Sequence, residues 1–376
     1  MKKLTFNKDK KFKIMQIADV QDTHHTSPDT LNFMRACLEK EKPDLVIFTG
    51  DQLKGYGVSF RGGDQNAKVK KAITNIVSVV DDMGIPFTFT FGNHDHQSGG
   101  DKAYQRSIYE SFDNFVCENE YDGIEGNATF ALEIKSSSSD KTALNVFVFD
   151  SLSNDKVNGG YESVTKEQNE WLLNCSKQIA EKNGGEKIPA IVFQHIPVCE
   201  MYNLLEKSSK DDKEAILGNI SHREYYKLPS ELKKDGAFML ENIACPTVNN
   251  GQFDAFLEEG NIFAAYFGHD HNNSFIGNYK GIDLGYTQGA GFNVYGPGLD
   301  RAVRVFEFDE DDVKNYKTRT VTYRSVLGKR LKRPLKNFIY TNAPSSIDAA
   351  KPMIIKGVIA AAAIVAVGVG IYLLKK

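Results

Sequence analysis

The sequence has 376 residues, of which 41% are hydrophobic and 25% are charged, and its formal net charge is −3. This length can bury a substantial core in one large domain or two medium ones. The near-neutral charge gives no sign of a nucleic-acid partner, because such a partner needs a broad excess of basic residues. The five cysteines lack CxxC spacing and indicate reduced thiols rather than a disulfide framework.

Apolar, β-branched runs predict strands along the first two thirds of the chain, at residues 13–18, 45–49, 87–91, 143–149, 190–194 and 262–267. Segments of helical character alternate with them, at residues 29–42, 66–83, 104–118, 165–183 and 251–259. This alternation is typical of a βαβ sheet and predicts the α/β class. After residue 267, glycine-rich turns and alternating runs at 301–308 and 317–324 predict a mainly antiparallel sheet. Two packed sheets with helices outside them accommodate both patterns.

The C-terminal region has a different composition. Residues 357–374 carry no charge, and this length is just enough for a helix to cross a bilayer. A buried core helix is the alternative, but the proline-containing stretch before it leaves no evident domain for it to enter. We therefore expect a main domain at 1–326, a basic linker at 327–352 and a single transmembrane helix at 353–374. The basic cluster at 329–336 outweighs the two lysines at the C-terminus, so the positive-inside rule places the main domain in the cytoplasm.

Short polar motifs follow most of the predicted strands: Asp19-Val20-Gln21, Gly50-Asp51, Gly92-Asn93-His94-Asp95 and Gly268-His269-Asp270-His271, with His195 between the last two. The carboxyl ends of strands are where open α/β folds build active sites. Mixed oxygen and imidazole ligands suit Zn, Mn or Fe better than Ca. The motifs therefore predict a metal centre at one edge of a sheet.

Each motif has an expected part in a two-metal site. Asp51 can bridge two ions about 3.5–4 Å apart, with one carboxylate oxygen on each. Oxygen ligands for the first metal come from Asp19 and Gln21, and Asn93 offers its amide oxygen to the second. Three imidazoles complete the two shells, from His195, His269 and His271. Gly92 and Gly268 directly precede ligands, where a missing Cβ permits close backbone approach.

The next two residues of the third motif are predicted to act in catalysis rather than as ligands. His94 can lie over a bound phosphate, stabilise its charge and protonate the leaving group. Asp95 is then expected to orient the ring of His94.

Together these motifs resemble those of the calcineurin-like metallophosphoesterase family, whose pattern is D-x-H, GD, GNH(D/E), H and GHxH. The resemblance covers about residues 12 to 310, and residues 249–296 resemble a branch with fungal cell-cycle-regulating phosphatases and plant purple-acid-phosphatase-like proteins. It implies a four-layer α/β/β/α sandwich and a dinuclear site in which a metal-bound hydroxide attacks phosphorus directly. By position, one metal is held by Asp19, Asp51 and His271. The other is held by Asp51, Asn93, His195 and His269, and His94 assists the leaving group.

The chain departs from the family pattern at Gln21, where the first motif usually has histidine. An amide oxygen is a weaker ligand than imidazole, so the first metal is expected to bind less tightly or to prefer a harder ion such as Mn. A nearby imidazole, from His24 or His25, is the alternative ligand. Lys54 stands near the position of the tyrosine that colours purple relatives, so no purple enzyme is expected.

Two hypotheses of function follow. The first is a membrane-tethered phosphomonoesterase or phosphodiesterase that faces the cytoplasm and uses two divalent or trivalent ions (Mn, Fe or Zn). The second is a metal-binding scaffold of the same fold whose catalysis is weakened by Gln21. The ligand set fits nucleotides, sugar phosphates, phosphoproteins, cyclic nucleotides and phospholipid headgroups alike, so the phosphorylated substrate stays open.

Overall fold

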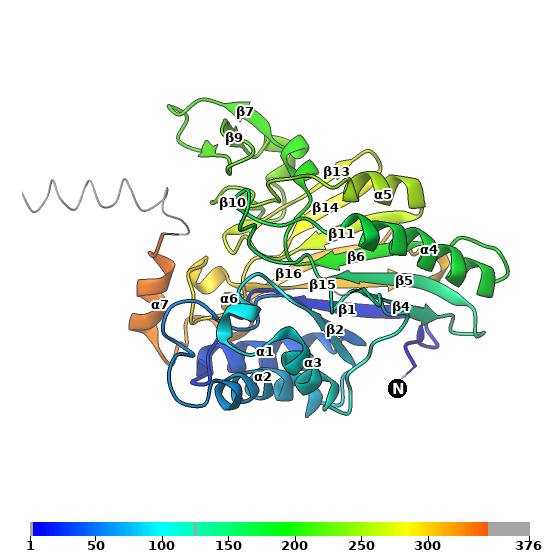
Figure 1. Ribbon diagram of the computed structural model, residues 1–376, viewed down its shortest axis with the longest axis horizontal. Coiled ribbons are helices and arrows are strands. Elements are labelled where there is room, and N and C mark those ends of the chain that lie inside the picture. The colour runs from blue at the N-terminus through cyan, green and yellow to red at the C-terminus, as the bar shows by residue number, and fades with distance from the viewer. Residues whose placement is uncertain (1–2, 124–125, 345–376) are drawn as a thin grey trace, which may run out of the picture.

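The computed structural model describes residues 3–123 and 126–344, and two stacked sheets form its centre (Figure 1). In spatial order, the five-stranded sheet contains β16 (Lys317–Thr322), β15 (Ala302–Asp309), β1 (Lys11–Ile17), β2 (Leu45–Thr49) and β3 (Phe87–Thr90). The six-stranded sheet contains β13 (Ile276–Tyr279), β14 (Ile282–Tyr286), β11 (Ile262–Phe267), β6 (Ala190–Gln194), β5 (Thr142–Phe149) and β4 (Phe130–Lys135).

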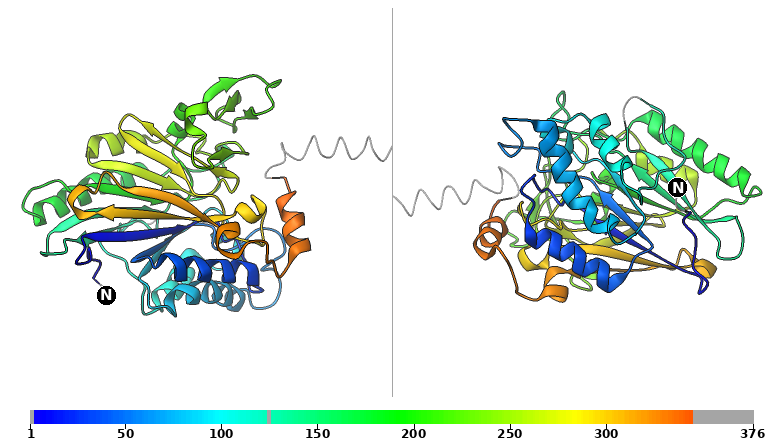
Figure 2. Two further views of the ribbon diagram at one scale, coloured as in Figure 1. Left: turned by 180° about the vertical axis from the view of Figure 1, so that it is seen from behind. Right: turned by 90° about the horizontal axis from the view of Figure 1, so that it is seen from below.

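Helices cover the outer face of each sheet (Figures 1 and 2). The five-stranded sheet is covered by α1 (Pro28–Glu41), α2 (Gln65–Asp81) and α3 (Lys102–Glu110). The six-stranded sheet is covered by α4 (Lys166–Lys182) and α5 (Gln252–Glu259). One apolar cluster fills the space between the sheets and under the first three helices, and a second lies beneath α4 and α5. The predicted mixed α/β class is confirmed.

The sheets meet through aromatic side chains of their inner faces. The ring of Phe193, in β6, packs edge-on against the ring of Phe306, in β15, with centroids 5.2 Å apart. Both side chains are fully buried. Because strands buried on both faces can be apolar throughout, runs such as 45–49 and 190–194 show no polar alternation.

The five strands that precede the polar motifs each run parallel to a neighbour. In the first sheet β1, β2 and β3 are parallel, and in the second β6 and β11 are parallel to each other and to β5. Their carboxyl ends therefore lie at one edge of the two sheets. Beyond this edge, two small sheets form from the 206–274 region: β7 (Glu206–Ser208), β8 (Ile216–Leu217) and β9 (Tyr225–Lys227), and β10 (Phe238–Met239) with β12 (Asn273–Ser274).

One predicted helix and one strand without a prediction differ from the sequence analysis. The helix expected at 104–118 ends at Glu110, because the chain at Phe115 and Val116 instead pairs with Phe87 at the edge of β3. Strand β4 was not predicted. It pairs antiparallel with β5 at the outer edge of the six-stranded sheet.

The segment expected to be a linker is partly helical. Short helix α6 (Tyr323–Leu327) follows β16, and α7 (Pro334–Thr341) begins at a proline, which is favoured at the first helical position. The backbone N–H groups of Lys332 and Arg333 donate to the carboxylate of Asp29, in α1, at 2.6 and 2.9 Å. These bonds attach α7 to the main domain.

Among the residues that the structure describes, none of the helices combines the length and apolar composition that a membrane crossing requires. The predicted transmembrane helix at 353–374 lies outside the described residues, so the structure does not bear on it.

Candidate metal centre

The predicted ligands come together where the parallel strands end. Asp19 follows β1, Asp51 follows β2, Asn93 follows β3, His195 follows β6 and His269 follows β11. All five side chains are at most 7% exposed, as are those of Gln21 and His271. The sequence therefore identified the strand ends that meet.

The backbone at this edge is held in a conformation that non-glycine residues seldom adopt. Four of the predicted ligands have positive φ angles: Asp19 (53°), Gln21 (36°), Asp51 (52°) and His269 (74°). Such strain clusters at functional sites, where the surrounding structure stabilises it. Glycines permit the close packing, because a Cβ on Gly92 would lie only 2.2 Å from Oδ1 of Asp51.

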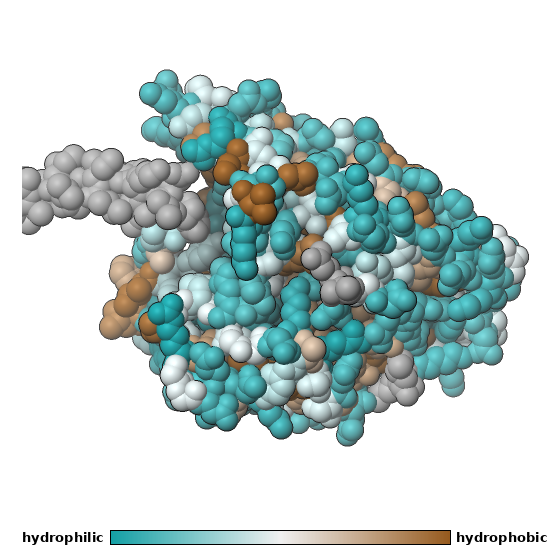
Figure 3. Space-filling model, viewed as in Figure 1, coloured by the Kyte–Doolittle hydropathy of each residue, from teal (hydrophilic) through white to brown (hydrophobic). Residues whose placement is uncertain are grey.

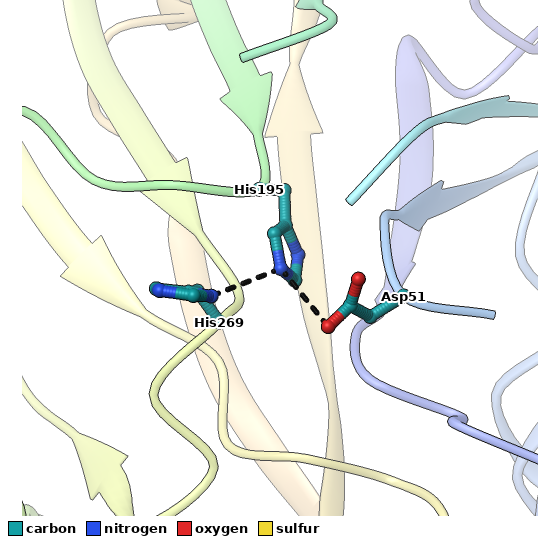
Figure 4. A group of neighbouring side chains, drawn as sticks. All are labelled: Asp51, His195 and His269. Carbon is teal, nitrogen blue, oxygen red and sulfur yellow. Dashed lines mark hydrogen bonds and ion pairs between the residues drawn. The ribbon is translucent and has the colours of Figure 1, made fainter. Parts of the chain in front are cut away.

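Four candidate ligand atoms surround one point. The Nε2 atom of His195 lies 3.3 Å from Oδ2 of Asp51, 3.2 Å from Oδ1 of Asn93 and 3.1 Å from Nδ1 of His269. Figure 4 shows the three titratable members of this group facing one another from separate loops. Ligands about 2.1 Å from a metal lie about 3.0–3.4 Å apart in octahedral or tetrahedral geometry. The observed spacings match that range.

Backbone carbonyls set the protonation of two imidazoles. Nδ1 of His195 lies 3.0 Å from the carbonyl oxygen of Thr49, and Nδ1 of His271 lies 2.9 Å from that of Tyr295. A carbonyl only accepts hydrogen bonds, so each Nδ1 carries a proton and each Nε2 is left for a second proton or for a metal ion. Each Nε2 faces a carboxylate oxygen, so either a proton or a metal ion must lie between them.

The carboxylate of Asp19 also needs a proton or a metal ion beside it. Oδ1 of Asp19 lies 3.2 Å from Nε2 of His271 and is buried without a hydrogen bond among the described residues. A buried anionic oxygen without a partner is costly unless an ion or a proton compensates it. The residues present therefore fit bound metal ions.

The electrostatics of the centre are dominated by Asp51. Burial opposes its charge, yet His195 and His94 outweigh burial and hold the pKa of the Asp51 carboxyl well below its usual range. Burial also lowers the pKa of His195, but the carboxylates of Asp51 and Asp19 outweigh it and raise the pKa to about 10. Asp51 is thus an anion that attracts whatever cation occupies the centre, as a bridging ligand must be.

The expected role of Asp95 is wrong. Its carboxylate does not orient His94, whose Nδ1 instead lies 2.8 Å from Oε1 of Gln97. The two oxygens of Asp95 accept backbone N–H groups from Gly92 (2.7 Å), Asp51 (2.8 Å) and Leu53 (2.9 Å). Burial and the nearby charge of Asp51 raise the pKa of Asp95 to about 7. Asp95 therefore joins the loops after β2 and β3, which carry Asp51 and Asn93.

Most of the chain matches one known protein family. The model of the family described as calcineurin-like phosphoesterase matches residues 12–273 of this chain. The chain belongs to the calcineurin-like phosphoesterase family. The predicted membership of this family is confirmed, and so is the predicted similarity to purple-acid-phosphatase-like proteins and to a yeast phosphatase.

The similar proteins carry names from the same group. The chain is 28% identical to "Probable inactive purple acid phosphatase 28" of Arabidopsis thaliana, over 81% of this chain and 77% of that protein. It is 24% identical to "Phosphatase DCR2" of Saccharomyces cerevisiae, over 82% of this chain and 53% of that protein. A dimetal phosphatase structure from Danio rerio aligns with a TM-score of 0.49 and 13% identity, over 83% of this chain and 99% of that one.

Within this calcineurin-like chain, Gln21 occupies the centre as the first motif predicts. Its Nε2 donates to Oδ2 of Asp51 at 2.7 Å, and its Oε1 accepts from the Tyr56 hydroxyl at 3.3 Å. The histidines considered as substitutes lie elsewhere. The rings of His24 and His25 pack together with centroids 4.1 Å apart and line an adjoining pocket.

Aromatic rings that the motifs did not predict pack against the histidines. Tyr295 stacks on His271 with centroids 4.2 Å apart, and Tyr161 packs edge-on against His269 at 4.3 Å. The ring of Tyr56 lies 4.5 Å from that of His94. Tyr161 and Tyr295 come from loops far from the motifs in sequence, whereas Tyr56 follows the Gly50-Asp51 motif by five residues. They fix ring orientations that the ligand motifs alone leave free.

Proposed function

We propose that this chain is a hydrolase that cleaves phosphoester bonds with the help of two bound metal ions. The convergence of Asp51, Asn93, His195 and His269 on one point carries the proposal, with Asp19 and His271 alongside. By these contacts Asp51, Asn93, His195 and His269 would hold one ion, and Asp19, Asp51, Gln21 and His271 the other. Ions bound there would supply a water nucleophile active at neutral pH and neutralise phosphate charge.

His94 is suited to protonate the leaving group. Its side chain is half-buried, whereas those of the ligands are buried, so its ring lies at the mouth of the centre. Its backbone N–H donates to Oδ1 of Asp51 at 2.8 Å, which fixes the residue beside the bridging carboxylate. With Nδ1 directed at Gln97, the protonated ring presents Nε2–H for donation to the departing oxygen.

The alternative is a metal-binding scaffold of the same fold with weak or no catalysis. Gln21 favours it, because the amide directs its N–H group rather than its oxygen at Asp51. The Arabidopsis relatives are named as probable inactive phosphatases, which also favours the scaffold. However, the Tyr56 hydroxyl can accept as well as donate. A reversed Gln21 amide would keep its contact with Tyr56 and turn its oxygen toward a metal, so we favour the hydrolase.

Metal analysis and hydrolysis assays decide between the two. We expect the purified full chain to bind about two metals and to hydrolyse aryl phosphate mono- or diesters when Mn, Fe or Zn is added. Asp51→Asn should reduce both stoichiometry and turnover, because it weakens the bridge. Asp101→Asn, at the exposed N-terminal cap of α3, is the matched control. Metal binding without turnover under any of these metals would establish the scaffold.

We further propose that the chain is held at a membrane by residues 353–374, with the catalytic domain in the cytoplasm. The support beyond the sequence is α7, which ends at Thr341, with 11 residues (342–352) between it and this region. Its apolar side chains Leu335, Phe338 and Ile339 are 72%, 66% and 57% exposed and gather on one patch (Figure 3). Fractionation with and without alkaline extraction tests the proposal, since a spanning segment resists extraction.

A further inference from the structure

A basic pocket of about 290 Å³ adjoins the metal centre on the side of α7. We call it the α7 pocket. Part of its wall comes from the loops that follow the metal ligands, namely His24, Lys54 and Asn293. Another part comes from Arg333, Lys336 and Tyr340, in α7 and the residue before it.

Tyr56 connects this pocket to the proposed leaving-group side of the centre. Its ring lies 4.5 Å from the ring of His94, and the ammonium group of Lys54 lies 5.2 Å from the same Tyr56 ring. Since His94 is placed to protonate the leaving group, the body of the substrate extends from the His94 side. The ring of Tyr56 lies between His94 and Lys54, so a substrate that extends past Tyr56 reaches Lys54.

The residues that line the pocket are basic or neutral. None of its lining residues is acidic, and in the described part of the chain no carboxylate pairs with the side chains of Arg333 or Lys336. The nearest acids along the chain have other partners. Asp22 accepts from the backbone of Thr23 and Ser27, and Asp29 accepts from the backbone before α7.

Two of the cations are brought together by Tyr340. The ammonium groups of Lys54 and Lys336 lie 4.6 and 5.7 Å from the centroid of its ring. Lys54 is also fixed by hydrogen bonds from its Nζ to the Asn293 carbonyl (2.8 Å) and to the Tyr340 hydroxyl (3.1 Å). An ammonium group has three donors, so Lys54 keeps one for a ligand. Two cationic side chains that line one pocket favour an anion there.

We propose that the α7 pocket binds a second phosphate group of the substrate. The preferred substrates are then compounds with at least two phosphates, of which one is cleaved at the metal centre and the other is held by Lys54, Arg333 and Lys336. Both free sugar or inositol bisphosphates and bisphosphorylated lipid headgroups have this chemistry. The inference rests on the proposed function for its cleavage step, but the binding step can be measured alone.

The binding arm uses the full chain freed of metal by a chelator and titrated calorimetrically with an inositol bisphosphate. Lys336→Gln should weaken binding by about tenfold, the effect of losing one charged hydrogen bond. Lys329→Gln makes the same change in charge at an exposed position outside the pocket and should leave the affinity unchanged. Equal affinity in wild type and Lys336→Gln would overturn the pocket assignment.

The hydrolysis arm compares kcat/KM for an inositol bisphosphate and the matching monophosphate, in the metal-loaded chain. A second pair presents phosphatidylinositol bisphosphate and monophosphate in phosphatidylcholine vesicles. A preference for the bisphosphate that Lys336→Gln reduces by about tenfold, through KM, supports the proposal, and the pair that shows it identifies the source. Equal kcat/KM within both pairs overturns it. If nothing is hydrolysed, the proposed function fails, and calorimetry still decides the pocket.

Discussion

Asp95→Asn tests whether this buried carboxylate joins the two ligand-bearing loops. In the structure one oxygen accepts from the backbone N–H groups of Gly92 and Asp51, and the other accepts from that of Leu53. Asparagine has one acceptor oxygen in place of two. If that oxygen faces Gly92 and Asp51, only the Leu53 N–H group loses its partner, and a buried unpaired donor costs about 1–3 kcal/mol. The opposite orientation leaves two donors unpaired, so the first is the more stable.

We therefore expect Asp95→Asn to lower the free energy of unfolding by about 1–3 kcal/mol, measured by urea denaturation of the metal-free chain. Asp101→Asn is the matched control. Asp101 caps α3 by accepting one exposed N–H group, from Tyr104, and asparagine caps a helix as well as aspartate does. Equal stability of Asp95→Asn and wild type would refute the reasoning, because three buried donors cannot lose an acceptor without cost.

Three further outcomes are expected. His94→Ala should lower turnover of an aryl phosphate by roughly two to four orders of magnitude while elemental analysis finds normal metal content; unchanged turnover would contradict its role. Gln21→His should tighten the weaker metal by about tenfold or more in a metal-buffer titration, because imidazole is the better ligand for these ions; an unchanged affinity would place Gln21 outside the metal shell. Glu41→Gln should lower the free energy of unfolding by about 1 kcal/mol at neutral pH, because Glu41 pairs with Arg319.

The pH dependence of the Glu41 effect has a definite sign. Burial raises the pKa of Glu41, but Arg319 and Lys13 outweigh burial and lower it. An acid with a lowered pKa in the folded state stabilises the fold above its unfolded pKa of about 4.3. That stabilisation is lost as pH falls through the folded pKa. Urea denaturation of wild type and Glu41→Gln at neutral and acidic pH should therefore give a difference that disappears in acid.

The sequence predicted which candidate ligands come together, because they follow strands whose ends meet. Each lies within four residues of an apolar run, and the fold class brings such ends together without further information. Reasoning from neighbouring residues also assigned Asp95 to orient His94, and that assignment is wrong. Its neighbour in sequence is His94, but its hydrogen-bond partners are set by how the loops after β2 and β3 pack. Local sequence does not encode that packing.

The α7 pocket was beyond sequence reasoning for a similar reason. In the sequence, Arg333 and Lys336 are only part of a basic cluster, because nothing in residues 329–336 specifies where that cluster docks. The decisive contacts are backbone hydrogen bonds to Asp29 and the approach of Tyr340 to Lys54. Each of these contacts joins segments about 300 residues apart in the chain.

The position of β1 in its sheet constrains the order in which this protein can fold. β1 lies between β2 and β15, and Lys11 pairs with Asp309 across the antiparallel junction. During synthesis, β1 is made early, but its second neighbour, β15, is made only when almost the whole domain is complete. β1 therefore cannot form both of its strand pairings until then. Such long-range pairing slows folding and leaves an unpaired strand edge exposed meanwhile. Since Asp19 follows β1 directly, we expect the metal centre to assemble in the last stages of folding, after β15 has docked.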